Sequence, residues 1–177
     1  PNMSAGEYER KQMIKTINAI CDSCAILSKE QIGALIVLER ETRIGDIIST
    51  GTIIDSQPSA DLIKNVFFPN SPLHDGALVI RSRRLYAAGC FLPLSDNYDI
   101  SKALGTRHRA ALGMSEVSDA LIVVVSEETG NITVAQNGKL DIGITVSTLS
   151  AILYREFVTE EKESTAEKKK LFRRSRK

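Results

Sequence analysis

The chain has 177 residues, of which 42% are hydrophobic and 25% charged, and its formal net charge is +1. This length suits one domain with a hydrophobic core and is short for two. No apolar run approaches the roughly 18 residues of a membrane span, and the start has no signal-peptide pattern. Three cysteines, an odd number, argue against a disulfide framework and favour a reducing compartment.

The charge is unevenly distributed along the chain. Residues 168–177 hold 7 basic residues and no acid, so residues 1–167 carry 16 basic against 22 acidic residues, a net charge of −6. An acidic body argues against nucleic-acid binding, and we expect no nucleic acid partner. Residues 160–177 lack apolar periodicity and are predicted to be a disordered basic tail. We expect a disordered N-terminal end at 1–6 and a folded domain at 7–159.

In the first half of the chain, apolar residues at spacings of three and four predict an amphipathic helix over 7–28. Cys21 and Cys24 lie on its apolar face. We interpret this pair as core packing rather than a redox or metal site, because no second Cys/His pair completes a site. The following segments are predicted as a buried strand at 34–38, a short strand at 52–54 and a helix capped by Ser59 that ends near 67.

The second half alternates strands with helices. The pattern predicts strands at 77–81, 85–92, 120–126 and 131–136, and helices at 106–116 and 145–159. The first two strands are close enough in sequence to form a hairpin, and Asn137-Gly138 is typical of a type I′ hairpin turn. The fold class is therefore predicted to be α/β, a single domain with a mixed central β-sheet covered by helices.

His74-Asp75-Gly76 follows a proline-containing turn and directly precedes a predicted strand. Gly76 allows close approach of the backbone to a ligand, and the imidazole and carboxylate can share a divalent cation. Asp75 is the best candidate for a catalytic group; ordinary turn chemistry is the alternative. A metal-dependent hydrolase of the HD type would need further ligands, and His108 is the only other histidine.

Gly105-Thr106-Arg107-His108-Arg109 opens a predicted helix. The free N–H groups and positive dipole end of a helix N-terminus form an anion site, to which arginine adds charge-assisted hydrogen bonds. Arg107 and Arg109 are two residues apart and point to nearly opposite sides of a helix. One can face phosphates while the other contacts a neighbouring loop or subunit. The alternative is a solvated basic turn.

Two further segments have both structural and functional interpretations. Residues 126–130 follow a predicted strand, where α/β proteins place ligand-binding groups, but the segment could equally be a plain acidic turn. Phe91 and Leu92 could form an apolar slot for a base; core packing in a strand is the interpretation we favour from the local sequence.

Together these motifs resemble the diadenylate cyclase (DAC) domain family. Residues 71–77 match its DGA motif and residues 105–109 its RHR motif. Residues 32–36, 87–94 and 126–130 also resemble family segments. The resemblance covers roughly residues 10–155 and is closest to the membrane-anchored type, in which membrane helices precede the amphipathic helix.

The resemblance implies condensation of two ATP into cyclic di-AMP and two pyrophosphates, with a divalent metal (Mg or Mn, possibly Co). Since one domain offers one nucleotide site and the product has two identical halves, a face-to-face homodimer is expected. The alternative is a non-catalytic nucleotide-binding regulatory module, which would not require Asp75 beside His74. A phosphoglucosamine mutase is a possible regulatory partner. Membrane helices absent from this chain would hold the full-length protein at the cytoplasmic face of the membrane, with this chain as a soluble cytoplasmic domain.

The resemblance also implies roles for individual residues. Asp75 would bind metal and activate the ribose 3′-hydroxyl, with His74 as a second metal ligand and Arg107 and His108 as further catalytic residues. Phe91 stands where family members often have tyrosine, so a hydrogen bond from that position is lost. The expected nucleotide-binding residues are Gly76, Ala77, Phe91, Leu92, Gly105, Thr106, Arg107, Arg109, Ser126 and Glu128.

Overall fold

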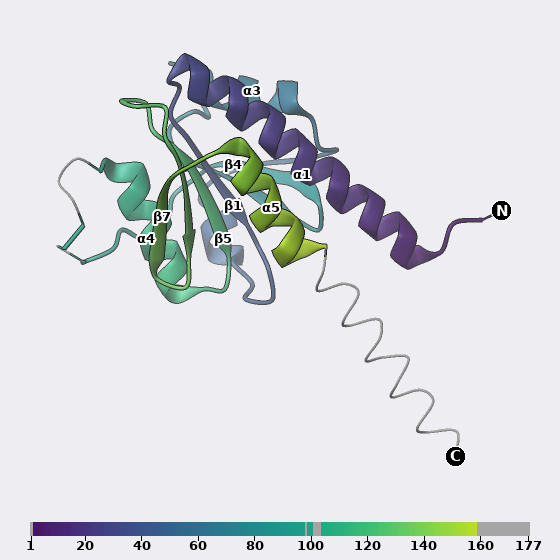
Figure 1. The fold of residues 1–177 in the computed structure, drawn as a ribbon. Helices are drawn as coiled ribbons and strands as arrows, with labels where there is room; N and C mark the ends of the chain where they lie inside the picture. Colours follow the sequence, from purple (N-terminus) through teal and green to yellow (C-terminus); the bar gives the residue numbers. More distant parts are fainter. Residues whose placement is uncertain (1, 98, 101–103, 159–177) are drawn as a thin grey trace.

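The computed structural model describes residues 2–97, 99–100 and 104–158. One seven-stranded sheet, in the order β2-β4-β3-β1-β5-β6-β7, lies between helices on both faces (Figure 1). The predicted α/β class with a mixed sheet is therefore confirmed. In chain order the elements are α1 (Ala5–Glu30), β1 (Ala34–Leu38), α2 (Gly45–Ile48), β2 (Thr52–Ser56), α3 (Ala60–Phe67), β3 (Ala77–Arg81), β4 (Arg84–Cys90), α4 (Thr106–Val117), β5 (Leu121–Val125), β6 (Ile132–Gln136), β7 (Lys139–Ile144) and α5 (Val146–Phe157).

The mixed character of the sheet comes from its central strand. β1 pairs parallel with β3 on one side and antiparallel with β5 on the other, and the remaining pairings are antiparallel. β1 and β5 are buried along their whole length because helices cover both faces. This burial explains why their sequences are continuous apolar runs rather than alternating ones.

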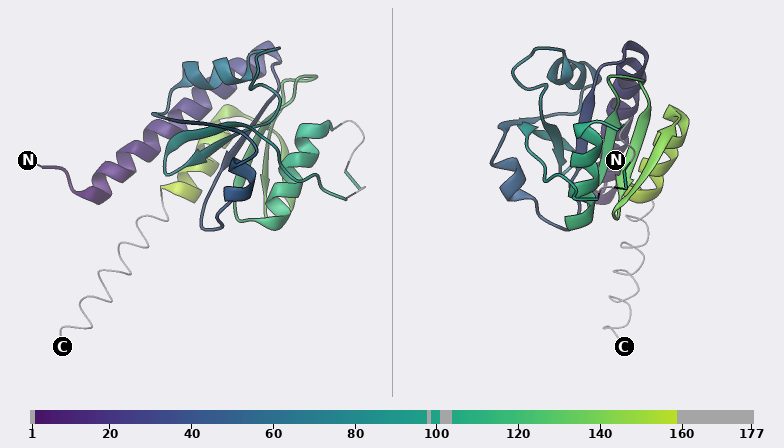
Figure 2. Two further views of the ribbon diagram at one scale, coloured as in Figure 1. Left: turned by 180° about the vertical axis from the view of Figure 1, so that it is seen from behind. Right: turned by 90° about the vertical axis from the view of Figure 1, so that its left-hand side faces the viewer.

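Side chains of the sheet alternate between two apolar clusters. One face packs against α1, α3 and α5, with Ile36 and Leu38 of β1 pointing into this cluster. The other face packs against α2 and α4 (Figure 2), and Leu35 and Val37 of β1 belong to this second cluster. Each pair of large apolar side chains buried in these clusters stabilises the folded state by several kcal/mol. The two layers of helices fix the strand ends in space, and the candidate site lies at one set of those ends.

The predicted core role of the CxxC pair is supported. Cys21 and Cys24 are buried in the cluster beneath α1. Burial raises the pKa of Cys21 to about 11 and that of Cys24 to about 12, so both thiols stay protonated at neutral pH. A protonated, buried thiol behaves as a small apolar side chain.

Several element boundaries differ from the sequence predictions. α1 begins at Ala5 rather than 7, because Ser4 and Glu7 form a reciprocal capping box. α2 is a single helical turn, too short to produce a periodic pattern. The predicted tail, residues 160–177, lies outside the described residues. Among the residues that are described, no helix has both the length and the hydropathy to cross a membrane.

The predicted strand 85–92 ends earlier than expected, and the core packing predicted for Phe91 is wrong. β4 stops at Cys90, and the Phe91 N–H donates to Thr50 Oγ1 at 2.9 Å instead of to a strand. Phe91 is 63% exposed. The reason is local, since Gly89, with φ of +66°, departs from the extended conformation where the pairing of β4 with β3 shifts register, and the strand ends one residue later.

Candidate active site

A cavity of about 560 Å³ lies where β3 begins, β5 ends and α4 begins. It brings together two motifs that are separated by about thirty residues in the sequence. Ala77 and Arg109 are not among its lining residues: Ala77 is fully buried in β3. The predicted residues that do line it are His74, Asp75, Gly76, Phe91, Leu92, Gly105, Thr106, Arg107, His108, Ser126 and Glu128.

Gly76 shapes the turn that carries Asp75 to the cavity. Its φ is +136°, and a Cβ at this position would lie 2.7 Å from the backbone carbon of Gly89. Both the backbone conformation and the space exclude any other residue. Asp75 is exposed at the mouth of the cavity, and among the described residues it forms no hydrogen bond or ion pair. Its carboxylate is therefore available to a ligand.

His74 is oriented by its own turn. Its Nδ1 lies 2.6 Å from the Ser71 carbonyl oxygen, an acceptor, so Nδ1 carries the proton and the Nε2 lone pair is left for a ligand. A histidine that donates one ring N–H to a backbone carbonyl is typical of metal-binding histidines.

The donor set at this turn fits a divalent cation held in part by substrate. The described part of the chain holds no group of three or more His, Cys, Asp or Glu placed to hold a metal. His74 and Asp75 would supply two ligands, and triphosphate oxygens and water the rest. Mg²⁺ would be held mainly by the carboxylate and the phosphates, whereas the imidazole ligand suits a transition metal better.

The N-terminus of α4 forms the opposite side of the cavity. Its N-cap residue is Gly105, and within the described part of the chain no side chain caps the free N–H groups of the first turn. Arg107 extends from this turn, with its Nη1 3.4 Å from Glu127. A helix N-terminus with an adjacent guanidinium is suited to bind phosphate.

His108 lines the cavity but is only 4% exposed. Burial, together with the positive charge of Arg107, lowers its pKa below the ordinary value, so the imidazole is neutral at pH 7. It can therefore act as a hydrogen-bonding group rather than as a cation.

Arg109 lies on the other side of α4 from Arg107. Its Nη2 donates to the Ser95 carbonyl at 3.0 Å, and the Ser95 N–H donates back to the Arg109 carbonyl at 3.0 Å. This reciprocal contact holds the loop that carries Leu92 and Leu94. One arginine of the pair thus contacts a neighbouring loop, as expected, and Arg109 is the one that does so; it does not line the cavity.

Ser126 has a defined hydrogen-bonding state at the end of β5. Its Oγ accepts from the backbone N–H groups of Glu128 at 3.2 Å and Thr129 at 3.3 Å. Since both acceptor positions are used within the turn, the hydroxyl proton can be donated to a ligand.

Six further residues line the cavity and were not predicted from the sequence. Glu127 and Leu94 flank predicted residues, so proximity in sequence could have indicated them. Leu35 and Val125 could be placed at the cavity only once the pairing of β1 with β5 was known. In this pairing Leu35 lies opposite Val124, which puts the start of β1 beside the end of β5. The six are Leu35, Cys90, Leu94, Ala110, Val125 and Glu127.

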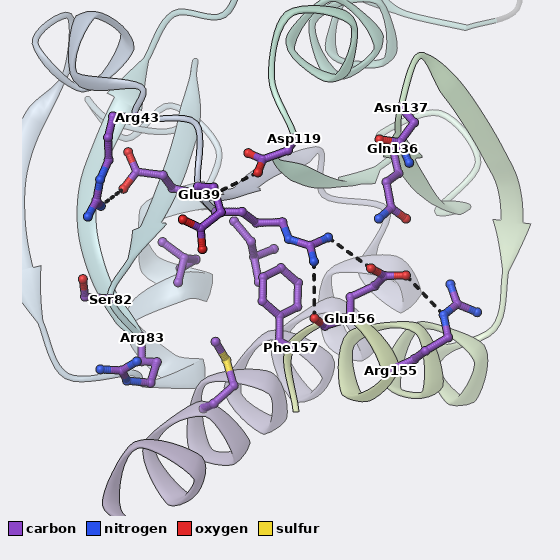
Figure 3. A pocket seen from close by; sticks show the side chains of 15 residues that line it. Glu39, Arg43, Ser82, Arg83, Asp119, Gln136, Asn137, Arg155, Glu156 and Phe157 are labelled. Carbon is purple, nitrogen blue, oxygen red and sulfur yellow. Dashed lines mark hydrogen bonds and ion pairs between the residues drawn. The ribbon is translucent and has the colours of Figure 1, made fainter. Parts of the chain in front are cut away.

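A larger cavity, about 1000 Å³, lies at the opposite ends of the strands (Figure 3). Three of the four carboxylates that line it are paired within the chain, and the fourth, that of Glu41, belongs to an exposed residue. Glu39 accepts from Arg81 Nε at 2.7 Å, Asp119 from the N–H groups of residues 41 and 42, and Glu156 from Arg40. None of the predicted site residues lines this cavity. Although it is larger, its polar chemistry is structural, so the smaller cavity is the candidate active site.

Comparisons with known proteins identify the family of this chain. Residues 21–140 match the model of the DAC family, described as DisA bacterial checkpoint controller nucleotide-binding. The chain is 49% identical over 143 residues to the cyclic di-AMP synthase CdaA of Bacillus subtilis, covering 81% of this chain and 52% of that protein. The chain thus spans about half the length of the curated relatives it matches.

Two crystal structures show the same fold. A double mutant of DacA from Staphylococcus aureus superposes with a TM-score of 0.80 at 49% identity, covering 82% of this chain and 97% of that one. A hypothetical membrane spanning protein from Bacillus cereus gives a TM-score of 0.69 at 43% identity, covering 72% of this chain and 63% of that one. With a family model matched over most of its length, the chain belongs to the DAC family.

Proposed function

We propose that this chain is the catalytic domain of a diadenylate cyclase, which condenses two ATP into cyclic di-AMP and two pyrophosphates. The observation that carries the proposal is the placement of Asp75 and His74 across one cavity from the phosphate-binding N-terminus of α4. The cavity volume, about 560 Å³, lies in the range of small-molecule sites. The names of the relatives, cyclic di-AMP synthase and diadenylate cyclase, support the same reaction.

Each polar residue has a role in this reaction. The Asp75 carboxylate accepts the proton of a ribose 3′-hydroxyl, whose oxygen then attacks the α-phosphorus of the second nucleotide as pyrophosphate leaves. Arg107, the first N–H groups of α4 and the Ser126 hydroxyl hold phosphate oxygens, with Glu128 beside them. A divalent cation (Mg or Mn, possibly Co) bound by His74 and Asp75 would neutralise charge on the triphosphate and the departing pyrophosphate.

The apolar side of the cavity suits an adenine ring. Phe91, Leu92 and Leu94 leave β4 together, and Phe91 and Leu94 are 63% and 50% exposed. Exposed aromatic and aliphatic side chains beside a phosphate site offer a stacking surface for a base. The neutral imidazole of His108 faces the same cavity and would act as a hydrogen-bonding group there.

Arg107→Ala is expected to weaken ATP binding by about 1.5–3 kcal/mol, the usual contribution of hydrogen bonds to charged groups. The reason is that Arg107 belongs to the first turn of α4 and lines the same cavity as the helix N-terminus. Calorimetric titration with ATP measures the change. Arg43→Ala, whose side chain is 72% exposed at the other end of the sheet, is the matched control and should leave ATP affinity unchanged. Equal affinities for Arg107→Ala and the unsubstituted chain would assign Arg107 a structural role.

The reaction requires two chains. One cavity holds one ATP, whereas each 3′-hydroxyl must attack the other nucleotide, so two cavities must meet across a two-fold axis. Specific activity should therefore rise with protein concentration, and an excess of Asp75→Asn chain should suppress turnover by the unsubstituted chain. Both effects are measured by titrating product formation against protein concentration and mutant fraction. Constant specific activity on dilution, together with no interference by the mutant, would contradict the dimer.

A non-catalytic nucleotide-binding module is the alternative, and Asp75 beside His74 argues against it because binding alone does not require a base. In the full-length protein we propose an anchor that precedes α1 and holds the domain at the cytoplasmic face of the membrane. The name of the Bacillus cereus relative, a hypothetical membrane spanning protein, supports a membrane anchor. A phosphoglucosamine mutase is the regulatory partner that the family resemblance suggests.

A further inference from the structure

Gly33, in the link between α1 and β1, lies directly against the guanidinium of Arg107. A Cβ built at Gly33 would lie 2.4 Å from Arg107 Nη1, 2.7 Å from Cζ and 3.2 Å from Nε, and these are the three nearest atoms. The guanidinium therefore rests on the bare Cα of Gly33, inside the volume that any side chain there would occupy.

The backbone at Gly33 does not itself require glycine. Its φ lies outside the left-handed region, in contrast to Gly76 and Gly89, so alanine can adopt the same conformation. Gly33 is nevertheless buried at the start of the central strand. The contact that a methyl group would disturb most is the one with Arg107, which is the far end of a flexible side chain. Alanine is thus expected to displace Arg107 rather than to unfold the domain.

Glu127 is the other group that could position Arg107, and it is the weaker one. The separation of 3.4 Å exceeds the 2.7–2.9 Å or so of a charge-assisted hydrogen bond. The Glu127 side chain is 65% exposed, against 22% for Arg107, and exposed ion pairs contribute little. A hard steric boundary at Gly33 constrains the guanidinium more tightly than this long, solvated pair does.

We propose that Gly33 is a positioning residue, which sets the location of the Arg107 guanidinium at the α4 N-terminus and thereby the affinity of the cavity for the ATP phosphates. The inference rests on the proposed function, because it assigns Arg107 to the substrate phosphates. A methyl group at position 33 displaces the guanidinium from its present position relative to the first turn of α4, so that its contact with a phosphate bound in the cavity is weakened.

The test is a double-mutant cycle on ATP affinity, measured by calorimetry, with melting temperature as a second readout. Gly33→Ala should raise the Kd for ATP roughly tenfold, as expected for one weakened charge-assisted contact, with little change in melting temperature. Gly45→Ala is the matched control, since a Cβ there has no neighbour within 4 Å and its φ is ordinary. It should leave both readouts unchanged.

The cycle is completed in the Arg107→Ala background. If Gly33 acts through Arg107, adding Gly33→Ala to Arg107→Ala causes no further loss of affinity. An equal tenfold loss in both backgrounds would overturn the inference, as would an unchanged Kd for Gly33→Ala.

Glu127→Gln provides a test that does not depend on the folding of a position 33 variant. Removal of a carboxylate from an anion site should leave ATP binding as tight as before or tighter. A tenfold loss in this variant would show that the ion pair positions Arg107, and would overturn the role of Gly33. Failure of the unsubstituted chain to bind ATP would count against the proposed function itself. Normal ATP binding with no effect at position 33 would count against this inference alone.

Discussion

Asp75→Asn is expected to abolish formation of cyclic di-AMP while the chain keeps its fold. The amide cannot accept the 3′-hydroxyl proton and is a poorer metal ligand, and the loss of a general base alone lowers rates by roughly 10²–10⁴-fold. Asp75 is exposed and forms no hydrogen bond or ion pair among the described residues, so its replacement costs little stability. The measurement is initial rate at saturating ATP and metal, with circular dichroism to verify the fold.

Asp141→Asn is the matched control for this experiment. Asp141 is an exposed carboxylate on β7, far along the sheet from the cavity, and its substitution should leave the rate unchanged. Near-normal turnover by Asp75→Asn would contradict the assignment of the catalytic base. Loss of secondary structure in this variant would show that the turn at residues 74–76 has a structural role as well.

Glu39→Ala is expected to lower the free energy of unfolding by about 3 kcal/mol. The Glu39 side chain is 1% exposed and accepts hydrogen bonds from Arg81 at 2.7 and 2.8 Å and from the Ile44 N–H at 3.0 Å. Removing one partner of a buried ion pair usually costs 3–5 kcal/mol or so. We expect the lower limit because Arg81 is 24% exposed and can regain some water. Denaturant unfolding measures the difference.

The same substitution should change how stability depends on pH. Burial would raise the pKa of Glu39, but hydrogen bonds from Arg81, the Ile44 N–H and Arg43 outweigh burial and lower it below 4.5. Because the folded state binds the proton less tightly, the stabilisation is complete above about pH 4.5 and is lost as the pH falls through the lowered folded-state pKa. The difference in free energy of unfolding between Glu39→Ala and the unsubstituted chain should therefore become smaller in acid.

Glu41→Gln, at an exposed position two residues along the chain, is the control and should leave stability within about 0.5 kcal/mol. If Glu39→Ala unfolds at the same denaturant concentration as the unsubstituted chain, the buried ion pair contributes nothing net to stability. If the difference in free energy of unfolding between the two proteins is the same at pH 7 and pH 3, the assigned pKa shift is contradicted.

Local sequence predicted most of the fold because strong patterns coincide with its elements. The apolar runs of β1 and β5 reflect burial on both faces, and Asn137-Gly138 adopts the positive φ angles that a type I′ turn requires. The exit of the chain at Phe91 could not be predicted in this way. It depends on the left-handed conformation of Gly89 and on a hydrogen bond to Thr50, some forty residues away in the sequence.

The candidate site, like the fold, could be predicted only in part from the local sequence. The motifs at 74–76 and 105–109 were recognisable because their chemistry is local: adjacent ligands, and arginine at a helix start. Leu35 and Gly33 lie in the segment 32–36 that resembles the family, but no role could be assigned to them, because each joins the site only when β1 is paired with its neighbours and α4 is packed on the sheet. Arg109 had the right chemistry for phosphate but faces the Ser95 loop, a choice set by the rotation of α4 about its axis.

The most direct test of the account is to identify the product that this chain makes from ATP. The chain is incubated at high concentration with ATP and, separately, Mg²⁺, Mn²⁺ or Co²⁺, and the products are identified by mass. We predict cyclic di-AMP and pyrophosphate in a ratio of one to two with at least one of these metals, and no cyclic product from 3′-deoxy-ATP, which lacks the attacking hydroxyl. ATP that binds but remains unconverted with every metal, or that is hydrolysed to ADP and phosphate, would contradict the account.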